Sequence, residues 1–187
     1  MDQRVGTHDC CTTGGAVARN FDLAVIGAGS AGFSAAITAA EGGKRVALIG
    51  HGTIGGTCVN VGCVPSKTMI RAAEALHGAR AAHRFPGLRG EAQVADWAAL
   101  VAGKDTLVEN LRQKKYADLL PRYEGVTYFD EGPARLVPGG VEVGGRKITA
   151  PKVIVATGGR PAVPNITGIA GVPTLNSTSL LELERLP

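Results

Sequence analysis

The chain has 187 residues, of which 44% are hydrophobic and 27 are glycine, and its formal net charge is +4. This length suits one domain with at most part of a second, and the apolar content is sufficient for a packed core. The basic residues are scattered and the aromatic residues (four Phe, three Tyr, one Trp) are spread along the chain, which argues against a nucleic-acid surface, and no apolar run is long enough to span a membrane.

The first predicted unit is a strand, a glycine-rich turn, a helix and a second strand. Residues 21–27 (FDLAVIG) are typical of a buried parallel strand, and residues 44–50 (KRVALIG) are typical of the next one. Between them, Gly27, Gly29 and Gly32 form a GxGxxG pattern at the start of a helix rich in small residues. The first glycine permits the tight turn, the second admits a pyrophosphate, and the third lets the helix pack on the strand. The pattern therefore predicts a dinucleotide-binding βαβ unit.

One residue that this fold usually carries is absent. An acidic side chain commonly ends the second strand and binds the ribose hydroxyls. Here Gly50 stands at that position, followed by His51 and Gly52. Either His51 or a backbone group takes over the ribose contact, or the adenosine is held less tightly.

A pair of cysteines, Cys58 and Cys63, follows the second predicted strand. On a regular helix their spacing gives about 7.5 Å of rise and roughly 140° of rotation. A disulfide prefers Cα atoms about 4.4–6.8 Å apart, so the adjacent glycines must relax the backbone to close a bridge. A helix start and the nearby Lys67 favour thiolate over thiol. We interpret the pair as a redox pair; a structural bridge or two buried free thiols are the alternatives.

The remaining elements are predicted from apolar patterning and turn residues. A helix carrying the cysteines is expected at about 57–82, and a second long helix at about 93–120. Strand 153–157 should return to the parallel sheet, and residues 177–184 should form a short capped helix. Short strands are expected in a small meander at 126–129, 134–137, 141–143 and 147–149.

Together, the GxGxxG unit and residues 56–67 (GTCVNVGCVPSK) resemble the flavin- and disulfide-dependent pyridine nucleotide oxidoreductases. This family includes glutathione reductase, dihydrolipoamide dehydrogenase and mercuric reductase. Residues 52–67, 111–116 (LRQKKY) and 155–164 (VATGGRPAVP) are similar to the mercuric reductases within it. The resemblance implies an α/β fold: a Rossmann-like FAD-binding domain with a parallel sheet and a small antiparallel β-meander.

The resemblance also implies roles for individual residues. Cys63 would be the charge-transfer thiolate against the flavin, Cys58 the outer, interchange sulfur, and Lys67 would stand near the reactive edge of the isoalloxazine. Electrons would pass from NADPH through FAD to the cysteines, which would hold Hg(II) as a thiolate complex and release Hg(0), in keeping with the affinity of soft thiolates for soft metals. Lys67 could instead be a solvated lysine, and Thr157-Gly158-Gly159 a plain strand-to-loop turn. Other contacts to FAD would come from Gly27, Gly29, Gly32, Gly52, Thr57, Ala134, Thr157 and Gly158.

Cys10 and Cys11 lie in residues 1–20, which we expect to form a flexible N-terminal arm. Adjacent cysteines in such an arm are either incidental thiols or metal ligands that pass Hg(II) inward to Cys58 and Cys63.

The resemblance implies that residues 21–187 form an incomplete FAD-binding domain, because the later Gly-Asp flavin contact of the family is not among them. The family also needs an NADPH-binding and a dimerisation domain, and no GxGxxG occurs beyond residue 55. We interpret the chain as an N-terminal fragment of a mercuric ion reductase, inactive alone and homodimeric at full length, with no nucleic-acid or membrane partner. Its dithiol must stay in balance with NADPH, which favours the cytoplasm. The alternatives are a dihydrolipoamide dehydrogenase and, from another class, a non-catalytic thiol protein that binds soft metals.

Overall fold

The computed structural model describes residues 20–186, and its central element is a four-stranded parallel sheet. The strand order is β3-β2-β1-β7, and every neighbouring pair runs parallel. Strand β2 is buried along its whole length, which explains its uninterrupted apolar sequence. The predicted parallel sheet is confirmed. Its strands are β1 (Leu23–Ile26), β2 (Val46–Ile49), β3 (Val126–Phe129) and β7 (Val153–Val155).

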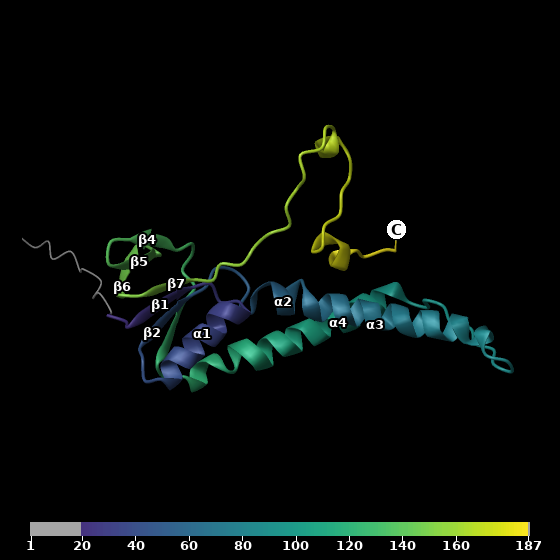
Figure 1. Ribbon diagram of the computed structural model, residues 1–187, viewed down its shortest axis with the longest axis horizontal. Coiled ribbons are helices and arrows are strands. Elements are labelled where there is room, and N and C mark those ends of the chain that lie inside the picture. The colour runs from purple at the N-terminus through teal and green to yellow at the C-terminus, as the bar shows by residue number, and fades with distance from the viewer. Residues whose placement is uncertain (1–19, 187) are drawn as a thin grey trace, which may run out of the picture.

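Helix α1 (Ser30–Glu41) connects β1 to β2 and covers one face of the sheet (Figure 1). Phe33 and Ala36 on this helix pack with Val25 and Leu48 in one buried cluster. Small residues dominate the helix, so its backbone can approach the strands closely. The predicted strand–turn–helix–strand unit is therefore present.

A three-stranded antiparallel sheet of β4 (Arg135–Val137), β5 (Gly140–Val143) and β6 (Arg146–Thr149) contributes to a second buried cluster. In that cluster Val141 and Ile148 pack with Ile49 and Phe129 from the parallel sheet. The antiparallel meander is thus confirmed in three of its four predicted strands.

The fourth predicted meander strand, residues 126–129, belongs to the parallel sheet instead, as β3 beside β2. The reason is visible in its two last residues. Phe129 packs into the cluster beneath the meander, whereas Tyr128 packs against the cluster beneath α1. A strand that contributes to the packing on both faces suits the central layer better than a meander.

The cysteine-containing helix is divided into α2 (Gly56–Asn60) and α3 (Cys63–Arg80), so the prediction of one helix over 57–82 is wrong. A 3₁₀ turn, Ala81–Arg84, then ends this region. The second long helix, α4 (Trp97–Arg112), starts after residue 96 because the Asp96 carboxylate accepts a 3.0 Å hydrogen bond from the Ala99 amide. A π-helical turn, Gln113–Ala117, and a 3₁₀ turn, Leu120–Arg122, follow α4.

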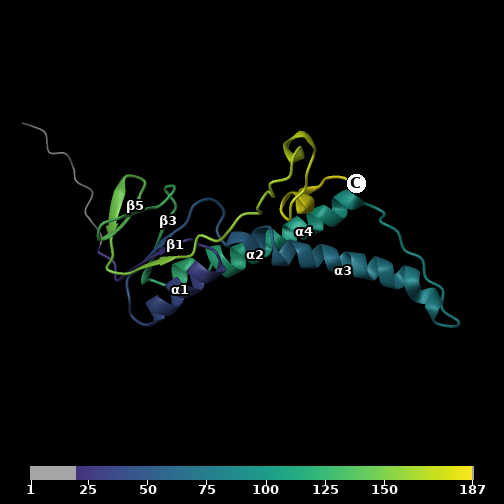
Figure 2. The ribbon, with the colours of Figure 1, turned by 45° about the horizontal axis from the view of Figure 1, so that its top comes forward.

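Helices α3 and α4 lie side by side and project away from the sheet, as Figures 1 and 2 both show. After β7 the chain leaves the sheet, passes through a 3₁₀ turn at Ile169–Gly171 and returns to α4. The short helix predicted at 177–184 is a 3₁₀ turn over Ser179–Glu182.

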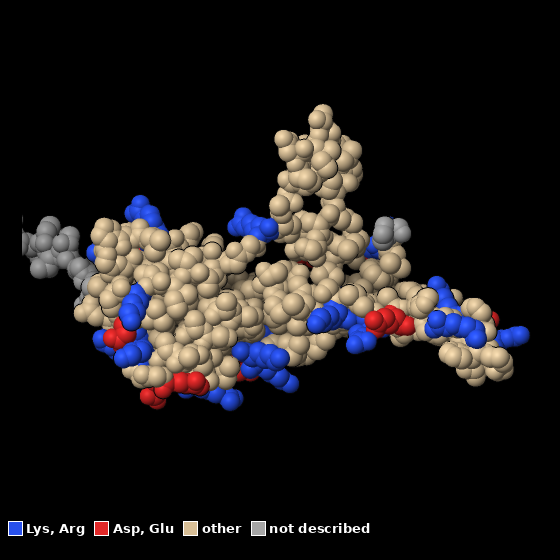
Figure 3. All heavy atoms as spheres, in the orientation of Figure 1, with Lys and Arg blue, Asp and Glu red and all other residues tan. Residues whose placement is uncertain are grey.

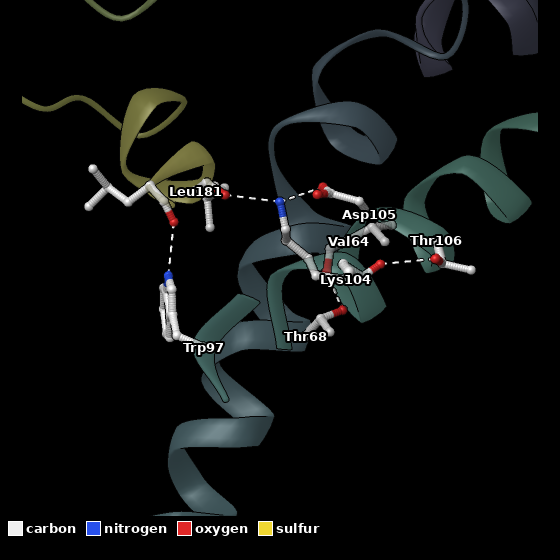
Figure 4. A network of polar contacts seen from close by, with 9 residues as sticks. Val64, Thr68, Trp97, Lys104, Asp105, Thr106 and Leu181 are labelled. Carbon is white, nitrogen blue, oxygen red and sulfur yellow. Dashed lines mark hydrogen bonds and ion pairs between the residues drawn. The ribbon is translucent and has the colours of Figure 1, made fainter. Parts of the chain in front are cut away.

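Two side chains of α4 hold this returning segment (Figure 4). Trp97 Nε1 donates a 2.9 Å hydrogen bond to the Leu183 carbonyl, and Lys104 Nζ donates one of the same length to the Leu181 carbonyl. Lys104 is buried and also forms an ion pair with Asp105. A buried lysine is therefore accommodated by satisfying its ammonium group with a carboxylate and a carbonyl.

Candidate functional site

A cleft of about 600 Å³ opens at the carboxyl ends of β1, β2 and β7. This is the edge of a doubly wound sheet at which ligands characteristically bind. The loop after β1, the loop after β2 and the first three residues of α2 form its walls, together with residues 132–134 and 156–158.

Most of the predicted FAD-contact residues meet in this cleft, although they come from five separate segments of the chain. Gly32 and Lys67 do not line it: Gly32 packs α1 onto the loop after β1, and Lys67 is exposed on α3. Cys10 and Cys11 lie outside the described residues. The predicted residues that do line the cleft are Gly27, Gly29, Gly52, Thr57, Ala134, Thr157 and Gly158.

The backbone of the loop after β1 fits a diphosphate. Gly27 has φ +117°, and a Cβ on it would lie 2.1 Å from the Ala156 carbonyl oxygen, so only glycine suits this position. No side chain caps α1 at Gly29, and the first amides of a helix have no partner within it. Amides in this position bind phosphate oxygens well.

The segment that carries the cysteines is attached to this loop. The Gly55 amide donates a 3.0 Å hydrogen bond to the Ala28 carbonyl, and Gly29 and Gly55 form an isolated β-bridge. Cys58 lines the cleft, while Cys63 starts α3 beyond the lining residues. Both are exposed free thiols.

Gly62 allows the two cysteines to come together. A Cβ at this position would lie 2.8 Å from the Thr57 carbonyl oxygen and 3.3 Å from the Cys58 Cα. The start of α3 can therefore fold back against α2, which a continuous helix would not permit. The predicted relaxation of the backbone by glycine is what interrupts the predicted helix.

The electrostatics of Cys58 differ from the prediction of a favoured thiolate. The pKa of its thiol lies above the ordinary cysteine value, mainly because of a hydrogen bond to the Cys63 side chain and next because of desolvation. Lys67 acts in the opposite direction, as predicted, but its effect on the pKa is smaller. Cys58 is thus held as a protonated thiol beside Cys63.

Asn60, which is not among the predicted site residues, fixes the segment between the cysteines. Its Nδ2 donates 2.9 Å hydrogen bonds to the carbonyls of Ile54 and Gly56, and its Oδ1 accepts a 3.1 Å bond from Arg112 Nη1. The only sign of this role in the sequence is that a polar residue stands between two cysteines. The hydrogen-bond partners of Asn60 cannot be read from the sequence, because one of them, Arg112, lies in a helix distant along the chain.

Tyr128 and Arg160 also line the cleft and were not predicted as site residues. Arg160 lies directly after the predicted Thr157-Gly158-Gly159 turn, so its position could have suggested it. Tyr128 could not be found in this way, because its place depends on how β3 pairs with β2. His51, one of the candidates for the ribose contact, lines the same cleft.

Metal-ligand clusters, charged patches or membrane-spanning helices among the described residues would also indicate a function. Within residues 20–186, no group of three or more His, Cys, Asp or Glu side chains is arranged to hold a metal ion. On the face shown in Figure 3, Lys and Arg form separate small groups and do not merge into one patch. None of the helices in the described part of the chain combines the length and apolar character needed to cross a bilayer.

The fold and site define a dinucleotide-binding domain with a dithiol next to its cleft. A family model described as pyridine nucleotide-disulphide oxidoreductase matches residues 21–187. The chain belongs to this family, and its members use FAD and a pyridine nucleotide.

Curated relatives of the chain include several mercuric reductases. The Streptomyces lividans enzyme is 46% identical over 175 residues, covering 89% of this chain and 36% of its own length. The Staphylococcus aureus enzyme is 47% identical over 171 residues (90% and 30%), and the Shigella flexneri enzyme 39% over 193 residues (100% and 33%). The chain thus spans about a third of the length of these relatives.

A solved structure with the same architecture is the HOCl-induced flavoprotein disulfide reductase RclA from Escherichia coli. It aligns with a TM-score of 0.72 at 31% identity, covering 89% of this chain and 35% of that one. Its Cu(II) complex aligns with a TM-score of 0.71 at the same identity, over 88% and 34%. The Rossmann-like FAD domain predicted from the sequence is therefore confirmed.

Proposed function

We propose that residues 21–187 form the FAD-binding part of a mercuric ion reductase, which reduces Hg(II) to Hg(0) with NADPH. The observation that carries the proposal is the attachment of the Cys58–Cys63 segment to the diphosphate loop, through Gly55 and Ala28, at the mouth of one cleft. The curated mercuric reductases that match this chain support the choice of substrate.

The lining residues would hold FAD by backbone and small side chains. Gly27 and Gly29, with the start of α1, would face the diphosphate, and Gly52, Thr57 and Ala134 would follow the remaining length of the cofactor. When bound, FAD would supply two-electron transfer from the reduced nicotinamide to the disulfide.

Cys58 and Cys63 are the residues of this chain that would react with the substrate. Reduction of the Cys58–Cys63 disulfide takes up two electrons and two protons and gives two thiols. Hg(II) then displaces both thiol protons and is held between the sulfurs, because soft thiolates bind soft ions. Two further electrons, which a second NADPH would supply, reduce the bound ion to Hg(0). The neutral atom then leaves, and both cysteines remain as thiolates. Cys58 lines the cleft and Cys63 lies just beyond its lining residues; the assignment of Cys63 to the flavin side and Cys58 to the substrate side therefore follows the resemblance alone.

The curated relatives are about three times as long as the part of them that this chain matches. The remaining two thirds of the relatives' length would provide the NADPH site and the contacts of a homodimer. A dithiol that must be kept in balance with NADPH suits the cytoplasm. Cys10 and Cys11 would capture Hg(II) and pass it inward; replacing both by Ser should then lower turnover only when thiol-buffered Hg(II) is limiting.

The test is a comparison of substrates on the complete gene product. Stoichiometric bound FAD, with NADPH oxidation stimulated by an Hg(II)–thiol complex and not by lipoamide, is the expected result. Activity with lipoamide alone would transfer the function to dihydrolipoamide dehydrogenase, the second candidate within the family. Absence of bound FAD would favour the non-catalytic, soft-metal-binding alternative.

A further inference from the structure

The end of β2 lacks the acidic side chain that binds ribose in most folds of this type, and the structure shows what stands in its place. Gly50 is buried, and its amide donates a 2.9 Å hydrogen bond to the Phe129 carbonyl at the end of β3. A Cβ added to Gly50 would lie 2.3 Å from Tyr128 Oη and 2.8 Å from Tyr128 Cε2. The tip of the Tyr128 ring therefore occupies the space into which a side chain at position 50 would project.

Parallel pairing of the strands sets this arrangement. In the β2–β3 register Leu48 faces Tyr128, and both pack toward the α1 side of the sheet. Gly50 lies two residues beyond Leu48, so its missing side chain would point to that same face. The tyrosine ring leans over it, and both Gly50 and Tyr128 line the cleft. An acid at position 50 and this placement of Tyr128 exclude one another.

The phenol of Tyr128 is chemically suited to a sugar hydroxyl. Its pKa is raised, first by burial and second by the charge of Asp130, so it stays protonated throughout the neutral range. A neutral phenol can both donate to and accept from a ribose hydroxyl, as a carboxylate cannot. Asp130 itself is not among the residues that line the cleft.

We propose that the Tyr128 hydroxyl binds the adenosine ribose of FAD and replaces the acid that is missing at Gly50. Tyr128 is thus a positioning residue for the cofactor. The inference rests on the proposed function, because it requires FAD to lie along the cleft with its diphosphate at the loop after β1. It assigns the ribose contact to a side chain from β3, in preference to His51.

The test measures ligand binding to the flavin-free complete gene product, not its activity. FAD is added back to the flavin-free protein, and ADP or 2′,3′-dideoxy-ADP, which lacks both ribose hydroxyls, then competes with it. Flavin fluorescence reports how much FAD is free. The parent should bind ADP about threefold to tenfold more tightly than the dideoxy compound, the range for one neutral hydrogen bond. Tyr128→Phe should bind the two compounds equally, and Tyr123→Phe, outside the cleft, should behave as the parent.

A second variant removes the contact without altering the tyrosine. Gly50→Ala should push the ring tip aside and abolish the same discrimination. Discrimination that persists in Tyr128→Phe would overturn the inference, while leaving the proposed function intact if the parent binds FAD. Loss of the discrimination in His51→Ala but not in Tyr128→Phe would assign the contact to His51. Failure of the parent to bind FAD at all would overturn the proposed function and this inference together.

Discussion

The Gly55 amide donates a 3.0 Å hydrogen bond to the Ala28 carbonyl, and this bond joins the two motifs on which the site depends. Ala28 belongs to the loop between β1 and α1, and Gly55 immediately precedes the turn that carries Cys58. The diphosphate loop and the redox segment therefore share one backbone connection. Substitutions that displace one of them are expected to affect the other.

Gly32→Ala tests the packing of α1 on the diphosphate loop. A Cβ at this position would lie 1.8 Å from the Gly27 carbonyl oxygen and 3.3 Å from Val25 Cγ1. Helix α1 must shift, and we expect a loss of about 1–3 kcal/mol in the free energy of unfolding with weaker FAD binding. Urea denaturation and FAD titration measure the two effects.

Gly103→Ala is the matched control, since position 103 is an exposed site inside α4 where an added Cβ would meet nothing within 4 Å. It should raise the stability by about 0.4–1 kcal/mol. Equal effects of the two substitutions would contradict the packing role of Gly32.

Asn60→Ala tests whether the cysteine segment is held in place by its amide side chain. The substitution removes the hydrogen bonds to the Ile54 and Gly56 carbonyls and leaves Arg112 without its amide partner. We expect closure of the Cys58–Cys63 disulfide by an added oxidant to slow severalfold, because the turn is less well ordered. Asn110→Ala, on an exposed position of α4, is the control, and an unchanged closure rate in Asn60→Ala would refute the role.

The raised pKa of Cys58 predicts how its reactivity depends on pH. Because only the thiolate reacts, a higher pKa means that less of Cys58 is reactive at pH 7.5. Cys63→Ala removes the hydrogen bond that is the main cause, so the pKa should fall and alkylation by iodoacetamide should accelerate. The difference should disappear at high pH, where Cys58 is ionised in both proteins. Mass spectrometry of the Cys58 peptide separates this reaction from that of Cys10 and Cys11; slower alkylation in Cys63→Ala would contradict the assignment.

Lys104→Met should loosen the segment that returns to α4. Methionine keeps an unbranched apolar side chain that is one heavy atom shorter, but it leaves the Leu181 carbonyl without its donor, at a cost of about 1–3 kcal/mol. Hydrogen exchange of residues 179–183 should become at least severalfold faster, while exchange in β1 and β2 is unchanged. Lys114→Met, at an exposed position, should have no such effect, and protection retained in Lys104→Met would show that the segment is anchored in another way.

The sequence was sufficient for the parts of the fold that depend on local signals. The GxGxxG turn, the buried β2 and the return of β7 follow from motif and apolar patterning, and the structure confirms them. The cleft collects most predicted cofactor residues because they all follow strands or start helices at one edge of the sheet. The position of β3 was missed because a short apolar strand carries no information on its partner.

Two features of the site depend on contacts that spacing alone does not reveal. The break between α2 and α3 accompanies the close approach of Gly62 to the Thr57 carbonyl. That approach depends on the path of the backbone in space, which residue spacing does not specify. Likewise, Tyr128 lies against Gly50 only because β3 pairs with β2 in one register. The direction of the Cys58 pKa was missed for a related reason: the contact with Cys63 outweighs the effect of Lys67.

The redox role of Cys58 and Cys63 is tested most directly by an anaerobic reductive titration of the complete gene product, in which the electrons taken up per bound flavin are counted. If Cys58 and Cys63 form the redox partner of FAD, the parent protein takes up two electrons more per flavin than Cys58→Ser or Cys63→Ser, because a disulfide is a two-electron acceptor. Cys58→Ser should also keep a long-wavelength charge-transfer absorption that Cys63→Ser lacks. Equal electron uptake by the parent and both variants would contradict the assignment of Cys58 and Cys63 as the redox partner of FAD.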